Sequence, residues 1–209
     1  MFSAGFDRRR GFPAPVLFLA AALVAAGGAC GNGDEEELAR HRERLNAGFA
    51  GPDSPLPAEE RASFAGLEFY PYDPGLVFRV PLDRRRAGAP VIMLDTKGEE
   101  RRYTVAGTAA FTVDGSAVQV TLYRDPEDPA DAPLFLPFRD ATSGGETYHG
   151  GRYLDVPATR ESFLLIDFNR AYLPYCAYDV RWACPLVPGE NVLAVGIRAG
   201  EKGRAAGPG

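Results

Sequence analysis

The sequence predicts an all-β protein, with short helices at its N-terminal end and a single domain folded as a β-sandwich or a partly open β-barrel. Short runs of the chain alternate between apolar and polar residues, which is the pattern of half-buried strands. Asp114-Gly115 lies between two such runs and predicts a two-residue hairpin turn, because both turn positions need positive φ. The 24 glycines and 18 prolines separate the runs, as turn residues do in all-β domains.

Two helices are expected before the strands. Residues 35–49 are rich in charge, and Leu38, Leu45 and Phe49 recur at roughly helical spacing, which predicts a short amphipathic helix lying on the domain. A second, brief helix is expected over residues 58–64, because Pro57 suits a helix start and Gly66 follows the end.

About eight strands are expected after these helices. In residues 103–113 every second position is aromatic, aliphatic or glycine, and residues 118–122 resume the alternation beyond the Asp114-Gly115 turn. Lys97-Gly98 predicts a similar turn after the apolar run at 91–94. The remaining strands are expected at residues 75–82, 134–138, 152–156, 163–168 and 191–198.

Residues 1–29 have the pattern of an export signal. Arg8, Arg9 and Arg10 precede an apolar run of 11 residues at 16–26, which is shorter than the ~20 residues of a membrane-spanning helix. The segment resembles a bacterial lipoprotein signal, because small residues precede Cys30, which would be acylated and tie the chain to the membrane. Cleavage after Ala29 that leaves Cys30 a plain thiol is the alternative. Arg9-Arg10 also resembles the core of a twin-arginine signal, and every one of these routes exports the chain.

The exported chain would divide into three parts. Residues 30–50 hold the anchor, an acidic tether and the short helix, residues 51–203 form the single β-rich domain, and residues 204–209 form a disordered tail. Residues 1–29 contain three of the 23 basic residues and one of the 28 acidic ones, so 20 basic and 27 acidic residues remain, a charge of −7. This acidic balance argues against nucleic acid as a partner.

Several blocks of the chain resemble one protein family. They are F-x-G-L-x-F-Y-P at 64–71, L-F-L-P-F-R-D-x-T-x-G at 134–144, E-T-Y-x-x-G-R-Y-L at 146–154, D-F-N-R-A-Y-x-P-Y-C-A-Y at 167–178, C-P-L-x-P-x-E-N at 184–191 and A-G-E-K at 199–202. They resemble domain-of-unknown-function family 1684, from residue 45 to residue 202. Leu173 departs from the pattern, in which asparagine is usual. The resemblance implies a domain type and no activity or cofactor.

Cys176 and Cys184 are the cysteines that remain once Cys30 is the anchor. A disulfide between them suits an exported protein and would close a small loop. Zinc held with His149 is an alternative, although the spacing is not that of structural zinc sites, and no metal site is predicted. The residue types also fit a nucleophilic Cys176, served by His149 and oriented by Asn169, and they fit two inert thiols.

Two loops carry most of the remaining polar chemistry, at residues 144–152 and 167–191. Arg152 and Arg170 lie near Asp155 and Asp167, so each arginine either forms an ion pair that holds its loop or converges with the other on an anion. The tyrosines of the two loops and Trp182 are numerous enough to line a pocket. The predicted ligand-binding residues are Tyr148, Arg152, Asn169, Arg170, Tyr172, Tyr175, Glu190 and Asn191.

The sequence thus predicts an exported domain, anchored at the cell envelope and facing the periplasm or the exterior, that binds a small polar or anionic ligand without a cofactor. A hydrolase acting on an envelope or extracellular substrate is the alternative, with Asp140, Glu146 or Asp167 as acid and base and His149 assisting. A structural lipoprotein without a ligand is the third hypothesis. Convergence of His149 with two carboxylates in a cleft would favour the enzyme, and a filled pocket would favour the structural role.

Overall fold

The computed structural model describes residues 31–159 and 163–203, and it confirms a mostly β domain with few helices. The predicted export signal, Cys30 and the tail at 204–209 lie outside the described residues. The strands are β1 (Val77–Pro81), β2 (Pro90–Leu94), β3 (Glu100–Val113), β4 (Ser116–Arg124), β5 (Leu134–Phe138), β6 (Arg152–Val156) and β7 (Phe163–Asp167). The helices are α1 (Gly31–Ala50) and α2 (Ala58–Arg61), with short 3-10 turns η1 (Pro74–Leu76), η2 (Phe168–Arg170), η3 (Tyr175–Ala177) and η4 (Gly189–Asn191).

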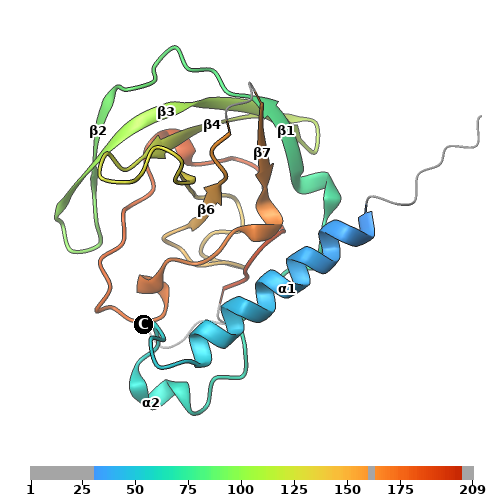
Figure 1. Cartoon of the computed structure of the whole chain (residues 1–209), viewed down its shortest axis with the longest axis vertical. Helices are drawn as coiled ribbons and strands as arrows, with labels where there is room; N and C mark the ends of the chain where they lie inside the picture. Colours follow the sequence, from blue (N-terminus) through green and yellow to red (C-terminus); the bar gives the residue numbers. More distant parts are fainter. Residues whose placement is uncertain (1–30, 160–162, 204–209) are drawn as a thin grey trace, which may run out of the picture.

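The strands form two antiparallel sheets. Strands β2, β3, β4, β5 and β6 follow one another in the larger sheet, and β1 pairs with β7 in a separate ribbon that contacts β3 and β6 (Figure 1). The predicted hairpin turn between β3 and β4 is confirmed, because Asp114 and Gly115 have φ of 48° and 78°. The turn at Lys97-Gly98 is confirmed as well, with Gly98 at a φ of 82°.

The main core lies between the two sheets. Its fully buried side chains come from alternate positions of β4, β5, β6 and β7, as the period of two in the sequence requires. β3 carries a bulge between Val105 and Gly107. A Cβ on Gly107 would stand 2.7 Å from the carbonyl oxygen of Asp83 and 2.6 Å from the side chain of Leu82, so glycine lets the chain after β1 approach β3 closely.

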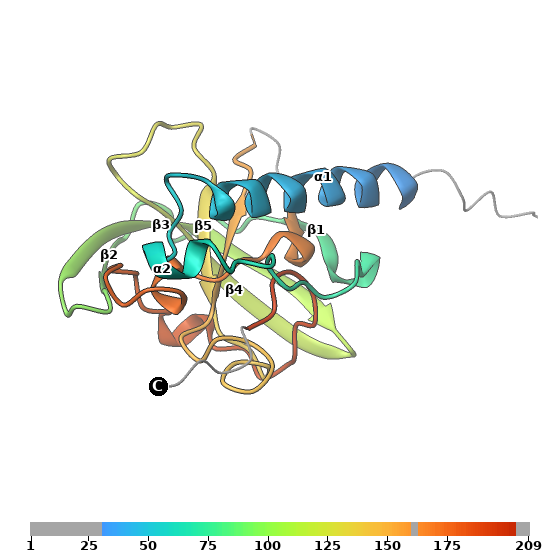
Figure 2. The ribbon, with the colours of Figure 1, turned by 90° about the horizontal axis from the view of Figure 1, so that it is seen from below.

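Helix α1 lies along one side of the β domain and does not cross the core (Figures 1 and 2). It is longer than the sequence pattern predicted, because it begins at Gly31 and includes the acidic segment that we expected to be a tether. Negative side chains such as Asp34 in a first helical turn interact favourably with the helix dipole, which favours a helical start at this segment. Leu38 and Phe49 are buried against the domain. Within residues 31–159 and 163–203, no helix is both long and apolar enough to span a membrane.

The strand predicted at residues 191–198 is wrong. The segment follows η4 as irregular chain, and it joins the loop after β5 through a bridge between Arg139 and Val192. Its alternating side chains are still buried in part, with Leu193 and Ile197 in the core. Backbone hydrogen bonds join residues 191–195 to residues 139–141, but this pairing amounts to one isolated bridge. The N–H and C=O of Ile197 are satisfied by the buried side chains of Asp140 and Arg152, so the alternation indicated burial and not a continuous strand.

Candidate functional site

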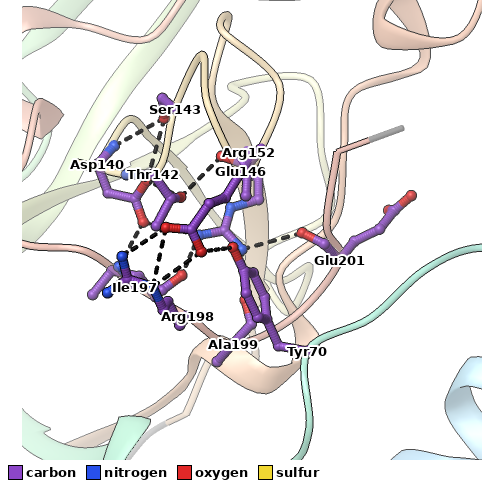
Figure 3. A network of polar contacts seen from close by, with 11 residues as sticks. Tyr70, Asp140, Thr142, Ser143, Glu146, Arg152, Ile197, Arg198, Ala199 and Glu201 are labelled. Carbon is purple, nitrogen blue, oxygen red and sulfur yellow. Dashed lines mark hydrogen bonds and ion pairs between the residues drawn. The ribbon is translucent and has the colours of Figure 1, made fainter. Parts of the chain in front are cut away.

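Arg152 occupies the centre of a buried polar network (Figure 3). Its side chain is 1% exposed, and Nη2 lies 2.9 Å from Oδ2 of Asp140. The guanidinium also donates to the carbonyls of Ile197 at 2.6 Å, Ala199 at 2.5 Å and Glu201 at 3.2 Å. Burial lowers the pKa of Arg152, and the charge of Asp140 opposes that effect. The three bonds to carbonyls hold the irregular segment at 197–201 against β6, so Arg152 has an architectural role here.

The expected pair of Arg152 with Asp155 is therefore wrong, and strand geometry explains the error. Both residues are on β6, three positions apart, and side chains at odd separations point to opposite faces of a strand. Arg152 points into the protein, whereas Asp155 points outward. The two arginines therefore do not converge, since Arg152 is enclosed by its own partners and Arg170 lies at a surface cleft.

Glu146 lies at the outer edge of the same network. Its carboxylate accepts bidentate hydrogen bonds from Arg198 at 2.6 to 3.1 Å and a hydrogen bond from the hydroxyl of Tyr70 at 3.0 Å. The bonds from Arg198 lower the pKa of Glu146, and burial together with Glu146 raises the pKa of Tyr70 to about 12. Glu146 is thus an ionised carboxylate whose oxygens already have donors.

Asn169, Asn191 and Glu190 hold loops in place and do not line the clefts described below. The side-chain amide of Asn169 accepts a hydrogen bond from the N–H of Asp73 at 2.8 Å and donates one to the carbonyl of Asp73 at 2.9 Å. The amide of Asn191 bonds both backbone groups of Thr121 and the carbonyl of Pro137, each at 2.8 Å. Glu190 accepts a hydrogen bond from Tyr123 at 2.8 Å. Such satisfied, buried amides fix chain geometry.

A cleft with a volume of about 780 Å³ lies between α1, β6 and the loop that follows β7. We call it the α1 cleft. Of the predicted site residues it contains Asp167, Arg170, Tyr172, Tyr175 and Cys184. Aromatic and aliphatic side chains form most of its wall, among them Leu45, Phe49, Leu67, Tyr153, Leu165, Leu173 and Trp182. Its size and its largely apolar wall with a few polar groups match those of small-molecule sites.

Asp155 is the polar group of the α1 cleft on β6. It is open to solvent on one side and has the apolar wall of the cleft on the other. Its Oδ2 accepts a hydrogen bond from the hydroxyl of Tyr172 at 3.1 Å. Desolvation by the surrounding wall raises the pKa of Asp155, although the bond from Tyr172 works in the opposite direction. Burial and the neighbouring carboxylate also raise the pKa of Tyr172, so its hydroxyl stays protonated and donates.

A cluster of charged side chains lies where α1 borders the cleft. Arg170 bridges Asp167 at 3.3 Å and Glu37 of α1 at 2.9 Å, which confirms the expected pair with Asp167. His41 lines the cleft one helical turn after Glu37. Burial and then the charge of Arg170 lower the pKa of His41, which favours the neutral imidazole.

Glu201 lies at the floor of the α1 cleft and is 2% exposed. Its Oε2 accepts the backbone N–H of Leu173 at 2.9 Å. Burial raises its pKa to about 8, so the carboxyl is largely protonated at neutral pH. Glu201 belongs to the A-G-E-K block at 199–202, but that block gave no sign of its burial, which depends on the fold of distant segments.

Cys176 and Cys184 lie side by side at a smaller cleft of about 340 Å³, which also includes Tyr148, His149 and Arg139. Both thiols are free in the structure, and the N–H of Cys176 donates to Sγ of Cys184 at 3.2 Å. A hydrogen bond between the thiols raises the pKa of Cys176 and lowers the pKa of Cys184 to about 7. The disulfide stays a prediction. No carboxylate of the described residues lines this cleft.

The four catalytic candidates lie at four separate positions. Asp140 is in the buried network, Glu146 is at its edge, His149 is at the cysteine cleft, and Asp167 is at the α1 cleft. Nor does any group of three or more histidines, cysteines and carboxylates among residues 31–159 and 163–203 have the arrangement of a metal site. Asp155, His41 and Glu37 also line the α1 cleft, although the sequence did not predict them as site residues. The helix predicted over residues 35–49 was the only sequence signal for His41 and Glu37.

Comparison with known proteins supplies a family and a fold. Residues 62–202 match the family described as "Protein of unknown function (DUF1684)". The chain is similar to an uncharacterised protein of Haloarcula marismortui with a solution NMR structure, at 32% identity and a TM-score of 0.65 over 82% of this chain and 95% of that one. Comparison with curated proteins gives no match. The chain belongs to the DUF1684 family.

Proposed function

We propose that the protein is an exported, membrane-anchored domain that binds an organic ligand in the α1 cleft. The observation that supports this function is the open space of about 780 Å³ between α1 and β6, because a structural lipoprotein would be expected to fill it with side chains. Leu165 is 54% exposed and Trp182 is 38% exposed at its wall, and exposed apolar side chains gathered in a concave site favour a ligand.

The charges of the cleft favour a neutral or cationic ligand over the anionic one that the sequence suggested. Asp155, Asp167 and Glu37 contribute carboxylates, whereas Arg170 is the only arginine or lysine among the described lining residues. Arg170 is already paired with Asp167 and Glu37. An anion would have to displace one of these partners and would meet the remaining carboxylates.

Export and anchoring rest on the N-terminal pattern, in which Cys30 follows an apolar run and small residues. Attachment at Cys30 would place the start of α1 next to the membrane, because α1 begins at Gly31. The α1 cleft would then lie close to the membrane surface, where amphipathic molecules gather.

The hydrolase alternative receives no support from the geometry of the described residues. Acid–base catalysis by His149 would need a carboxylate within reach. The three carboxylates expected as acid and base, Asp140, Glu146 and Asp167, are held elsewhere by arginines.

Trp182 offers a direct test, because it is the only tryptophan of the chain and it lines the α1 cleft. The exported Cys30→Ala chain carries no lipid and needs no detergent. We expect the uncharged dye N-phenyl-1-naphthylamine to bind it saturably, with energy transfer from Trp182 to the dye.

A pair of variants controls this experiment. Leu165→Asp should abolish dye binding, because Leu165 lines the cleft. Leu94→Asp should leave it unchanged, because Leu94 is similarly exposed, at 49%, on β2 and does not line the cleft. Both substitutions are at exposed positions, so loss of the fold is not expected. Dye binding that is absent, or equal in both variants, would refute the proposed site.

A further inference from the structure

Asp155 differs from the other carboxyl groups of the α1 cleft. Asp167 and Glu37 pair with Arg170, and Glu201 is buried, accepts the N–H of Leu173 and has a raised pKa of about 8. Among residues 31–159 and 163–203, no basic side chain forms an ion pair with Asp155. The Tyr172 hydroxyl donates to its Oδ2, which leaves Oδ1 able to accept a further hydrogen bond.

Aromatic rings line the same cleft as this carboxylate, and Tyr172 bonds it directly. The Tyr172 ring is perpendicular to the Tyr153 ring, at a centroid distance of 6.0 Å and an angle of 89°. Tyr175 and Trp182 form a second aromatic pair at 5.3 Å, and all four rings line the same cleft as Asp155. A carboxylate in a cleft lined by aromatic rings suits organic cations, which are attracted by the negative charge and by the negative faces of the rings.

The lack of a counter-charge at Asp155 carries an energetic cost. Surrounding apolar groups disfavour its charged form, and Asp128 adds a further negative charge nearby. A cation that enters the cleft would offset both disadvantages. Coulomb attraction would also be stronger there than in bulk water, because the aromatic walls lower the local dielectric.

We propose that the ligand of the α1 cleft carries an ammonium group, that Asp155 is its counter-ion, and that the apolar part of the ligand lies against Tyr153, Tyr172 and Trp182. This inference rests on the proposed binding function and adds the chemical class of the ligand. A primary ammonium suits the site best, because it can donate a hydrogen bond to the free oxygen of Asp155.

Three water-soluble probes of nearly the same shape test the inference: 2-phenylethylammonium, neutral 2-phenylethanol and phenylacetate. The exported Cys30→Ala chain is titrated with each probe, and the indole N–H resonance of its single tryptophan is followed by NMR. Hydrogen bonds to charged groups contribute enough that the ammonium should bind about tenfold or more tightly than the alcohol. Phenylacetate should bind most weakly.

Two variants locate the preference. Asp155→Asn keeps the shape of the side chain and removes its charge, so the ammonium should lose its advantage while the alcohol binds as before. Asp128→Asn removes a carboxylate that acts on Asp155 from outside the cleft, and the preference for the ammonium should persist.

The outcomes separate this inference from the function on which it rests. If the uncharged dye binds but the ammonium shows no preference, or if Asp155→Asn leaves the preference intact, the counter-ion role is overturned and the cleft remains a binding site. A preference for phenylacetate would overturn the inference in the same way. If neither the dye nor any probe binds, the proposed function fails and the inference fails with it.

Discussion

Replacing Arg152 with methionine tests the architectural role of the buried network. Methionine preserves most of the side-chain volume but leaves the Asp140 carboxylate without its counter-charge and three carbonyls of residues 197–201 without a donor. Removing one partner of a buried ion pair costs about 3–5 kcal/mol. The free energy of unfolding of a typical domain is about 5–15 kcal/mol, so Arg152→Met should remove a large share of the total stability.

Urea denaturation followed by circular dichroism at neutral pH measures this loss. Arg198→Met is the control, because it breaks the ion pair with Glu146 in which the arginine side chain is 63% exposed, and exposed pairs contribute little. Arg152→Lys keeps the charge but loses the planar fork, so its stability should lie between those of the wild type and Arg152→Met. If Arg152→Met were as stable as Arg198→Met, the network would not hold the 197–201 segment as we infer.

Three further predictions concern Glu201 and the cysteines. Burial raises the pKa of Glu201 to about 8 in the folded protein, so the folded state loses stability as the pH rises from about 4.5 to about 8. Glu201→Gln should therefore be more stable than the wild type near pH 8 by up to about a few kcal/mol, and should differ little from it near pH 5. The same stability difference at both pH values would contradict this prediction. Mass spectrometry after alkylation without reductant should find Cys176 and Cys184 of the exported protein joined, and alkylation of both would restore the free-thiol and zinc hypotheses. Cys30→Ala should abolish fatty-acid labelling and move the protein to the soluble fraction, whereas a wild type that is already soluble and unlabelled would contradict the lipid anchor.

Local sequence patterns were enough to predict the positions of most strands. β5 and β6 have the predicted bounds, and the Asp114-Gly115 hairpin follows from the φ values that these two residues allow. The predicted strand at 191–198 failed because alternation reports which side chains are buried and not what satisfies the backbone. Asp140 and Arg152 provide that satisfaction for Ile197, from distant positions in the chain.

The site was only partly predictable for a related reason. Tyr172, Tyr175 and Arg170 were expected at a pocket and lie at the α1 cleft. Asn169 and Asn191 have the residue type of ligand-binding side chains, yet their amides hold loop backbone. Asp155 was expected only as a partner of Arg152, whereas the alternation of side chains along β6 already excludes that pair and turns Asp155 outward.

A crystal structure of the exported Cys30→Ala chain grown with 2-phenylethylammonium would show whether the α1 cleft is a binding site for organic cations. We predict density for the probe between α1 and β6, with its nitrogen within hydrogen-bonding distance of Asp155 and its ring against the aromatic wall. A cleft closed by the protein's own side chains, with the probe absent or bound elsewhere, would contradict both proposals.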